Sequence, residues 1–69
     1  MHTVDSRGKR CPQPIIDLAK AMPAVAIGES ILLLSDDPAS TPDVQAWCRM
    51  TGHHLVEQSG DQHVVRRAK

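Results

Sequence analysis

Apolar and polar residues alternate along several short segments of the chain, as they do in half-buried β-strands. Residues 2–5 alternate in this way and predict a short edge strand. Residues 30–35, SILLLS, form an apolar run that is too short for a helix, which predicts a strand in the middle of a sheet. Residues 54–58 and 62–66 flank the turn-forming segment 59–61 and predict a β-hairpin.

Two other segments carry apolar residues at helical spacing. The first predicts a helix over residues 12–22, which Pro23 ends or kinks because proline lacks an amide donor and clashes with the preceding turn. The second predicts a helix over residues 42–51, with Thr41 as its N-cap and Gly52 as the left-handed residue that follows it. The predicted buried stripes are Ile15, Leu18, Ala19 and Met22 in the first helix, and Val44, Trp47, Cys48 and Thr51 in the second.

The predicted order of elements is strand, helix, strand, helix, strand, strand. With right-handed crossovers, this order predicts a two-layer α/β sandwich, βαβαββ, in which both helices pack on one face of a four-stranded mixed sheet. The 69 residues are enough for one small domain, spanning 1–69. Strand 30–35 is apolar on both sides, so one pair of its side chains is left on the face without helices: either Ile31 and Leu33, or Leu32 and Leu34.

Charge and composition disfavour two classes of function. Basic and acidic residues balance at a net charge of zero and Trp47 is the only aromatic residue, so general nucleic-acid binding is not expected; RNA contact through Arg66 and Arg67 stays a minor alternative. No apolar run is long enough to cross a bilayer, and the start of the chain does not resemble a signal peptide. We therefore expect a cytoplasmic protein whose two cysteines are free thiols.

The segment RCPQP, residues 10–14, places a cysteine directly before the first predicted helix. Cys11 is expected at the N-cap, because a residue before proline is extended and proline is favoured at the first helical position. Neither Pro12 nor Pro14 has an amide hydrogen, so the free amides that can point toward the sulfur are those of Gln13 and Ile15.

Charged residues surround this cysteine in sequence. The helix dipole and the positive charges of Arg7, Lys9 and Arg10 are expected to lower the pKa of the Cys11 thiol. Asp36 and Asp37 follow their strand as Cys11 follows the first one, so parallel strands would bring both loops to one edge of the sheet. There the two aspartates either orient a nearby arginine, contact a partner or only bond local amides of the turn, and a close carboxylate would raise the thiol pKa.

The surroundings of Cys11 narrow the reactions that it can perform. No histidine lies near it in sequence, so a hydrolase with a cysteine–histidine pair is not indicated. A dithiol oxidoreductase usually has a second cysteine two residues further on, where this chain has Pro14. A thiol without such partners can still accept a sulfur atom and hand it on, because attack on a persulfide requires little beyond access and a good leaving group.

The remaining cysteine and histidines are less informative. Cys48 lies on the apolar stripe of the second helix and is interpreted as a small buried hydrophobe. His53 and His54 are adjacent, so in a strand they point to opposite faces and do not readily bind one metal ion. The sequence therefore predicts no metal site.

Three segments of the chain carry a shared set of motifs: DSRGKRCPQP, with its Cys-Pro-x-Pro signature, GESILLLSDDPASTPDVQAWC, and the GHHLV that follows closely. Together they resemble the motifs of the TusA/SirA-like sulfur carriers. The resemblance covers almost the whole chain, with Pro23 as a departure in the first helix. It implies a βαβαββ sandwich, no cofactor other than a persulfide on Cys11, and two protein partners: a cysteine desulfurase or rhodanese as sulfur donor and an acceptor protein.

The family's pathways include tRNA thio-modification, molybdenum cofactor formation and sulfur oxidation. The resemblance implies a sulfurtransferase-type relay rather than an enzyme that turns over alone. The alternative from another class is a regulatory or adaptor module that binds a protein partner through the open face of its sheet, with Cys11 incidental.

Overall fold

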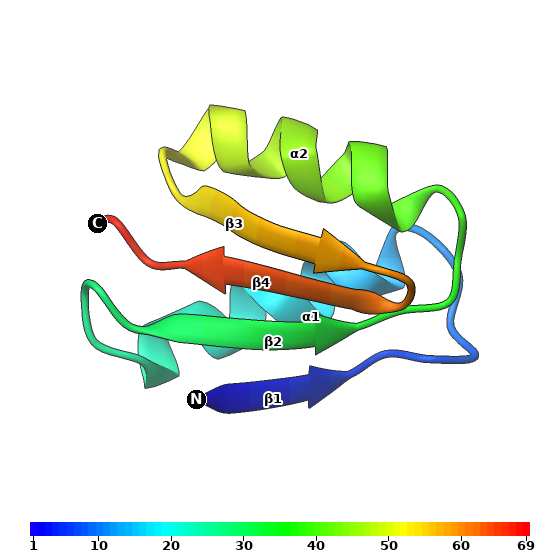
Figure 1. Ribbon diagram of the computed structural model, residues 1–69, viewed down its shortest axis with the longest axis horizontal. Coiled ribbons are helices and arrows are strands. Elements are labelled where there is room, and N and C mark those ends of the chain that lie inside the picture. Colours follow the sequence, from blue (N-terminus) through cyan, green and yellow to red (C-terminus); the bar gives the residue numbers. More distant parts are fainter.

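The computed structural model describes all residues of the chain, 1–69. Its strands and helices follow one another in the predicted order, with one additional 3₁₀ helix, η1 (Figure 1). The elements are β1 (His2–Asp5), α1 (Gln13–Ala21), η1 (Met22–Ala24), β2 (Ser30–Leu34), α2 (Ser40–Thr51), β3 (His54–Ser59) and β4 (Gln62–Arg66).

The strands form one sheet in the order β1-β2-β4-β3. β1 and β2 are parallel and β4 is antiparallel to both of its neighbours, so β1, β2 and β3 run in the same direction. The predicted mixed sheet, with β1 at an edge and β2 inside, is confirmed. The carboxyl ends of β1 and β2 meet at one edge, on the right in Figure 1, where the loops that lead into α1 and α2 begin.

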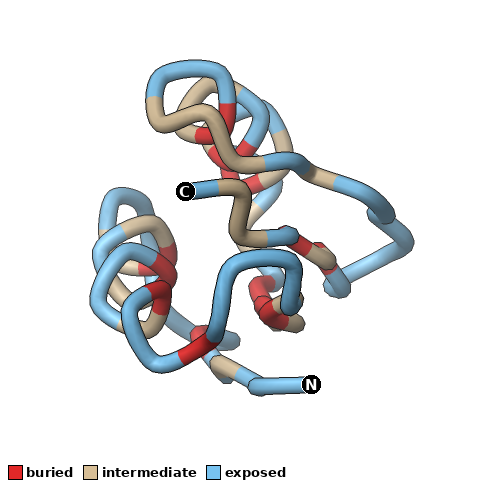
Figure 2. The backbone as a smooth tube through the Cα atoms, turned by 90° about the vertical axis from the view of Figure 1, so that its left-hand side faces the viewer, coloured by how far each residue is buried: buried red, intermediate tan, exposed pale blue.

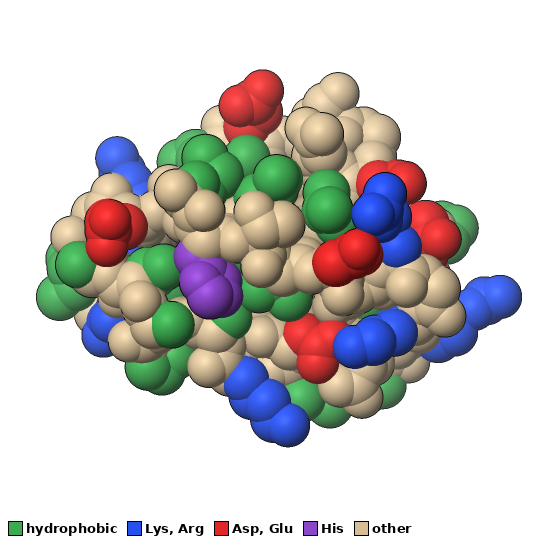
Figure 3. Space-filling model, turned by 90° about the horizontal axis from the view of Figure 1, so that it is seen from below, with side chains coloured by type: hydrophobic (Ala, Val, Ile, Leu, Met, Phe, Trp, Pro, Cys, Tyr) green, Lys and Arg blue, Asp and Glu red, His purple; other side chains and the backbone are tan.

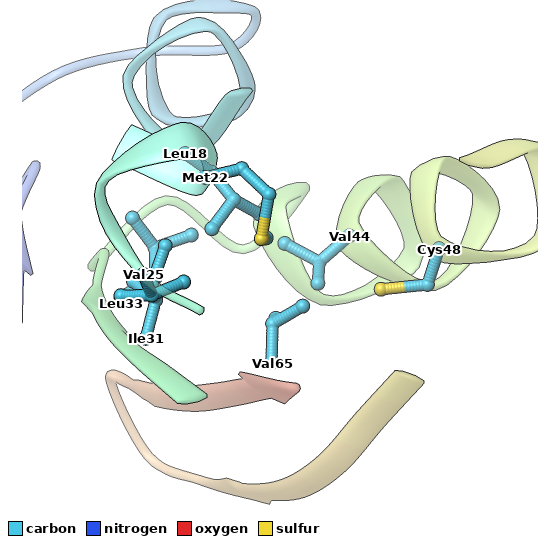
Figure 4. Close-up of a cluster of buried hydrophobic side chains, with 8 residues drawn as sticks. All are labelled: Leu18, Met22, Val25, Ile31, Leu33, Val44, Cys48 and Val65. Atoms are coloured by element: carbon cyan, nitrogen blue, oxygen red, sulfur yellow. The ribbon is translucent and has the colours of Figure 1, made fainter. Parts of the chain in front are cut away.

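The hydrophobic core lies between the sheet and the two helices. Ile31 and Leu33 are fully buried whereas Leu32 and Leu34 are only partly buried, which shows which side of β2 faces the helices. The buried parts of the chain, red in Figure 2, lie where helices and strands face one another. Figure 4 shows the side chains that meet there: Leu18, Met22, Val25, Ile31, Leu33, Val44, Cys48 and Val65.

Helix α1 is shorter than the sequence predicted. It begins at Gln13, with Pro12 in the N-cap position, and Pro23 lies in the 3₁₀ helix that follows it. The prediction that Pro23 ends or kinks this helix is confirmed. Ala19 is exposed, contrary to prediction, because the buried stripe is a single row four residues apart: Pro14, Leu18 and Met22.

Helix α2 begins earlier than predicted, at Ser40. The amide of Ser40 already donates a hydrogen bond to the carbonyl of Asp37, N–O 2.9 Å, so the turn after β2 winds directly into the helix. Thr41 is therefore not the N-cap, and its hydroxyl pairs instead with Nε2 of the buried His63 at 2.9 Å. Neither α1 nor α2 is long and apolar enough to span a membrane.

The end of α2 and the hairpin agree with the predictions. Gly52 has a φ of 84°, and its amide donates to the carbonyl of Cys48, N–O 2.8 Å, as expected of a left-handed residue after a helix. β3 and β4 pair antiparallel, with a register shift between Leu55 and Glu57. The hairpin places β4 between β2 and β3, which the sequence did not predict.

Candidate functional site

Two loops are tied together at the carboxyl edge of the sheet. The amide of Gly8 donates to Oδ1 of Asp36 at 3.0 Å, and the amide of Cys11 donates to Oδ2 of Asp37 at 2.8 Å. Oδ1 of Asp37 also accepts the amide of Ala39, N–O 3.0 Å, at the entrance to α2. The expectation that both loops lie at one edge is confirmed, and the two carboxylates bind the backbone of the Cys11 loop rather than an arginine side chain.

The thiol of Cys11 is exposed and faces the first turn of α2. Its S–H donates a hydrogen bond to Oδ2 of Asp43, with Sγ 2.6 Å from the oxygen. This hydrogen bond raises the pKa of the Cys11 thiol above its usual range, and desolvation and the negative charges of Asp43 and Asp37 act in the same direction. At neutral pH the free protein therefore holds Cys11 as a neutral thiol.

The prediction of a lowered pKa at Cys11 is wrong. The amide of Gln13 donates to the carbonyl of Arg10, N–O 2.8 Å, and no backbone amide, including that of Ile15, hydrogen-bonds Sγ. Because α1 begins at Gln13 with Pro12 in the N-cap position, Cys11 lies before the helix instead of capping it. The sulfur is thus next to carboxylates and receives no amide hydrogen bond.

The basic residues before Cys11 pair with other carboxylates. Arg7 forms an ion pair with Asp5, Nη2–Oδ2 3.0 Å, and Lys9 forms one with Asp17, Nζ–Oδ2 3.0 Å. Seen from the β1 side, acidic and basic side chains lie next to one another at this end of the molecule, on the right in Figure 3. Their charges are therefore partly neutralised and do not stabilise a thiolate at Cys11.

Asp17 anchors the first loop to α1. Its carboxylate accepts hydrogen bonds from Oγ of Ser6 at 2.7 Å, from Nε2 of Gln13 at 2.8 Å and from Lys9. These hydrogen bonds, that of Ser6 first, lower the pKa of Asp17 from its ordinary value of 3.8 to about 2. Gln13 thus supports the site through its side chain, whereas the sequence had assigned that role to its amide.

Arg10 lies in a hollow beside the two loop carboxylates, together with Gly8, Asp36, Asp37 and Pro38. The pKa of Asp37 is lowered mainly by the amides of Cys11 and Ala39, and the positive charge of Arg10 adds to this. Arg10 therefore acts on Asp37 rather than on the sulfur.

A shallow apolar depression of about 270 Å³ opens beside Cys11, between α1 and α2. Pro12 and Ile15 line it as predicted site residues, while Pro14 is fully buried. The sequence missed the contribution of α2, above all Asp43. The sequence did offer one signal for Asp43, because the second helix was predicted to begin at the same edge of the sheet as the Cys11 loop. The side chains that line the depression are Cys11, Pro12, Ile15, Asp43, Ala46, Trp47 and Met50.

The second cysteine is separate from this site. Cys48 is buried in the core, and this burial raises the pKa of its thiol. The interpretation of Cys48 as a small core residue is confirmed. His53 packs against Trp47 with ring centroids 5.4 Å apart, and its Nδ1 accepts the amide of Ala68, N–N 3.1 Å.

Comparison with known proteins agrees with the sequence motifs. Residues 2–67 match the family model described as Sulfurtransferase TusA. The chain belongs to this family. It is also similar to the crystal structure of a SirA-like protein from Desulfitobacterium hafniense, with a TM-score of 0.71 and 26% sequence identity over 94% of this chain and 92% of that one. The resemblance seen in the sequence is confirmed, and membership of the TusA family implies a role in sulfur transfer.

Proposed function

We propose that the protein carries sulfur as a persulfide on Cys11, between a donor protein and an acceptor protein. The observation that supports this best is the contrast between its two thiols: Cys11 is exposed on a loop held by Asp36 and Asp37, while Cys48 is buried. A carried sulfur must be accessible to partners and must not be captured by a second thiol of the carrier. The arrangement meets both requirements.

The proposed transfer conserves atoms and electrons. Sγ of Cys11 attacks the outer sulfur of a persulfide on the donor, the new Sγ–S bond forms, and the S–S bond of the donor breaks. The donor's inner sulfur leaves with the bonding electrons and takes a proton. Delivery to the acceptor is the same exchange with the carrier in the role of donor, so no cofactor is needed beyond the covalent persulfide.

The donor is proposed to be a cysteine desulfurase or a rhodanese, because these proteins present sulfur as a persulfide. The acceptor is proposed to be a protein of tRNA thiolation, molybdenum cofactor formation or sulfur oxidation. Free thiols persist in a reducing compartment, so the cytoplasm is the proposed location.

Mass spectrometry of the intact protein tests this function. After incubation with a cysteine desulfurase and cysteine, the wild type should gain one sulfur atom that a reductant removes. The Cys11→Ala variant should gain none, whereas the matched Cys48→Ala variant, which alters the core thiol, should still be loaded. Sulfur retained by Cys11→Ala, or absent from the wild type with several desulfurases and rhodaneses, would refute the proposal.

A further inference from the structure

We propose that Asp43 is a catalytic residue that accepts the proton of Cys11 while the sulfur is transferred. This inference rests on the proposed function and adds to it the proton acceptor that the sequence did not reveal. The side chain comes from α2, 32 residues away from Cys11 in sequence.

The contact between the two residues is exclusive. Oδ2 of Asp43 lies 2.6 Å from Sγ, which is within the distance required of a general base. Asp43 is the only hydrogen-bond partner of the sulfur, and the carboxylate of Asp43 has no other hydrogen bond. None of the four histidines of the chain and no lysine hydrogen-bonds Sγ.

The charges around the pair keep the proton on sulfur in the free protein. Asp43 lies in the first turn of α2, where the helix dipole favours a negative side chain. Asp37 adds a second negative charge from the loop before α2, and Arg10, the nearby cation, acts on Asp37. From α1 and its N-cap, the side chains that line the site are the uncharged Pro12 and Ile15.

The proton is expected to move only when the new bond forms. As Sγ bonds to the outer sulfur of the donor, its hydrogen becomes strongly acidic and passes to Oδ2 of Asp43. The donor's S–S bond breaks in the same step, and the proton then passes from Asp43 to the leaving thiolate. No oxidant or reductant is consumed, because sulfur is only exchanged between thiols. Asp43 thus allows a neutral thiol to act as the nucleophile.

The pH dependence of a model exchange tests this role. The reaction measured is mixed-disulfide formation between Cys11 and a neutral disulfide such as 2-hydroxyethyl disulfide. Because this disulfide has no ionisable group, only the protein's groups determine how the reaction rate varies with pH. If Asp43 is the base, the reactive form is the thiol beside an ionised carboxylate, and the wild-type rate should level off between about pH 5.5 and about pH 7.5. If the wild-type rate instead decreases about tenfold for each unit by which the pH is lowered across this range, only free thiolate attacks, and the proposal is overturned.

The Asp43→Asn variant keeps the size and an acceptor oxygen but removes the base. Its pH profile should have no level region, and its rate should decrease about tenfold for each unit by which the pH is lowered. Near pH 6 its rate should be at least about tenfold below that of the wild type. The matched Asp61→Asn variant, altered in the turn between β3 and β4, should keep the wild-type profile. A profile for Asp43→Asn that has the wild-type shape, whether displaced to lower pH or not, would overturn the proposal.

The test also separates this inference from the proposed function. Exchange at Cys11 is measured on the peptide that contains it and needs no physiological donor. The proposed function fails if a desulfurase or rhodanese cannot load the wild type, and the inference fails if the pH profile lacks its level region. Circular dichroism checks that Asp43→Asn is folded, and the wild-type profile can overturn the inference without any variant.

Discussion

The carboxylate of Asp37 accepts a hydrogen bond from the backbone amide of Cys11, N–Oδ2 2.8 Å, across 26 residues of sequence. Its other oxygen accepts the amide of Ala39 at 3.0 Å, where the chain enters α2. One side chain therefore joins the loop that carries the sulfur to the start of the helix that carries Asp43. The two segments that Asp37 joins are those that bring Sγ of Cys11 and Oδ2 of Asp43 together.

Removing the Asp37 carboxylate should loosen the Cys11 loop. We expect Asp37→Ala to load sulfur from a desulfurase several-fold more slowly, and we expect the Cys11 amide to exchange its hydrogen faster, because both amides lose their acceptor. Asp37→Asn retains an acceptor oxygen and should fall between the wild type and Asp37→Ala. Loading is followed by intact mass and amide exchange by NMR. Equal protection of the Cys11 amide in Asp37→Ala and wild type would contradict this role.

Asp17 should make stability depend on pH. Its pKa falls from 3.8 to about 2 on folding, so its ionised form stabilises the native state above about pH 3.8, and this contribution is lost as the pH falls toward 2. In urea unfolding near pH 6, Asp17→Asn should have a lower free energy of unfolding than the wild type. This difference in free energy should become smaller as the pH is lowered. Asp61→Asn is the matched control. If the difference in the free energy of unfolding grows as the pH is lowered toward about 2, the predicted direction of the pH dependence is wrong.

The aliphatic core should be sensitive to the loss of volume at Leu18, which is 0% exposed. We expect Leu18→Ala to lower the free energy of unfolding by about 2–5 kcal/mol, because it removes buried methyl groups and leaves a cavity. Ile16→Ala on the same helix removes a side chain that is 40% exposed and should cost about 1 kcal/mol or less. Urea denaturation measures the free energy of unfolding of both variants. Similar losses would contradict the orientation of α1, in which Leu18 is buried and Ile16 is exposed.

The open face of the sheet should be dispensable for sulfur chemistry. Leu32 pairs with Val64 on the side of β2 opposite the fully buried Ile31 and Leu33, so it faces away from the helices. Leu32→Lys should therefore accept sulfur from a small persulfide donor at the wild-type rate. The same variant probes the adaptor alternative, which predicts loss of partner binding with loading unchanged. A fall in loading of the folded variant would link this face to Cys11.

Local patterns in the sequence were sufficient for the elements of this fold. The apolar run that contains Ile31 predicted the interior strand, and Pro23 and Gly52 marked the ends of the helices, because each effect acts within a few residues. The parallel arrangement of β1 and β2 also made it predictable that the loop of Cys11 would meet the loop of Asp36 and Asp37.

The electrostatics of the site were not predictable in the same way. Arg7 and Lys9 are close to Cys11 in sequence, but each pairs with a carboxylate that only folding brings within reach or into the right orientation. Asp43, in the first turn of α2, is 32 residues from Cys11 in sequence, and only the folded arrangement of the two loops brings its carboxylate to the sulfur. Charge counts near a residue predict its pKa poorly when folding pairs those charges with carboxylates.

The position of β4 has a consequence for how the protein is made. The last strand of the chain lies inside the sheet, and it supplies the fully buried Val65 and the buried His63 that holds Thr41 of α2. A growing polypeptide on the ribosome cannot close its core before these residues emerge. Until β4 has joined them, β2 and β3 expose unpaired edges, so a chain in which β4 has not yet folded is prone to aggregate.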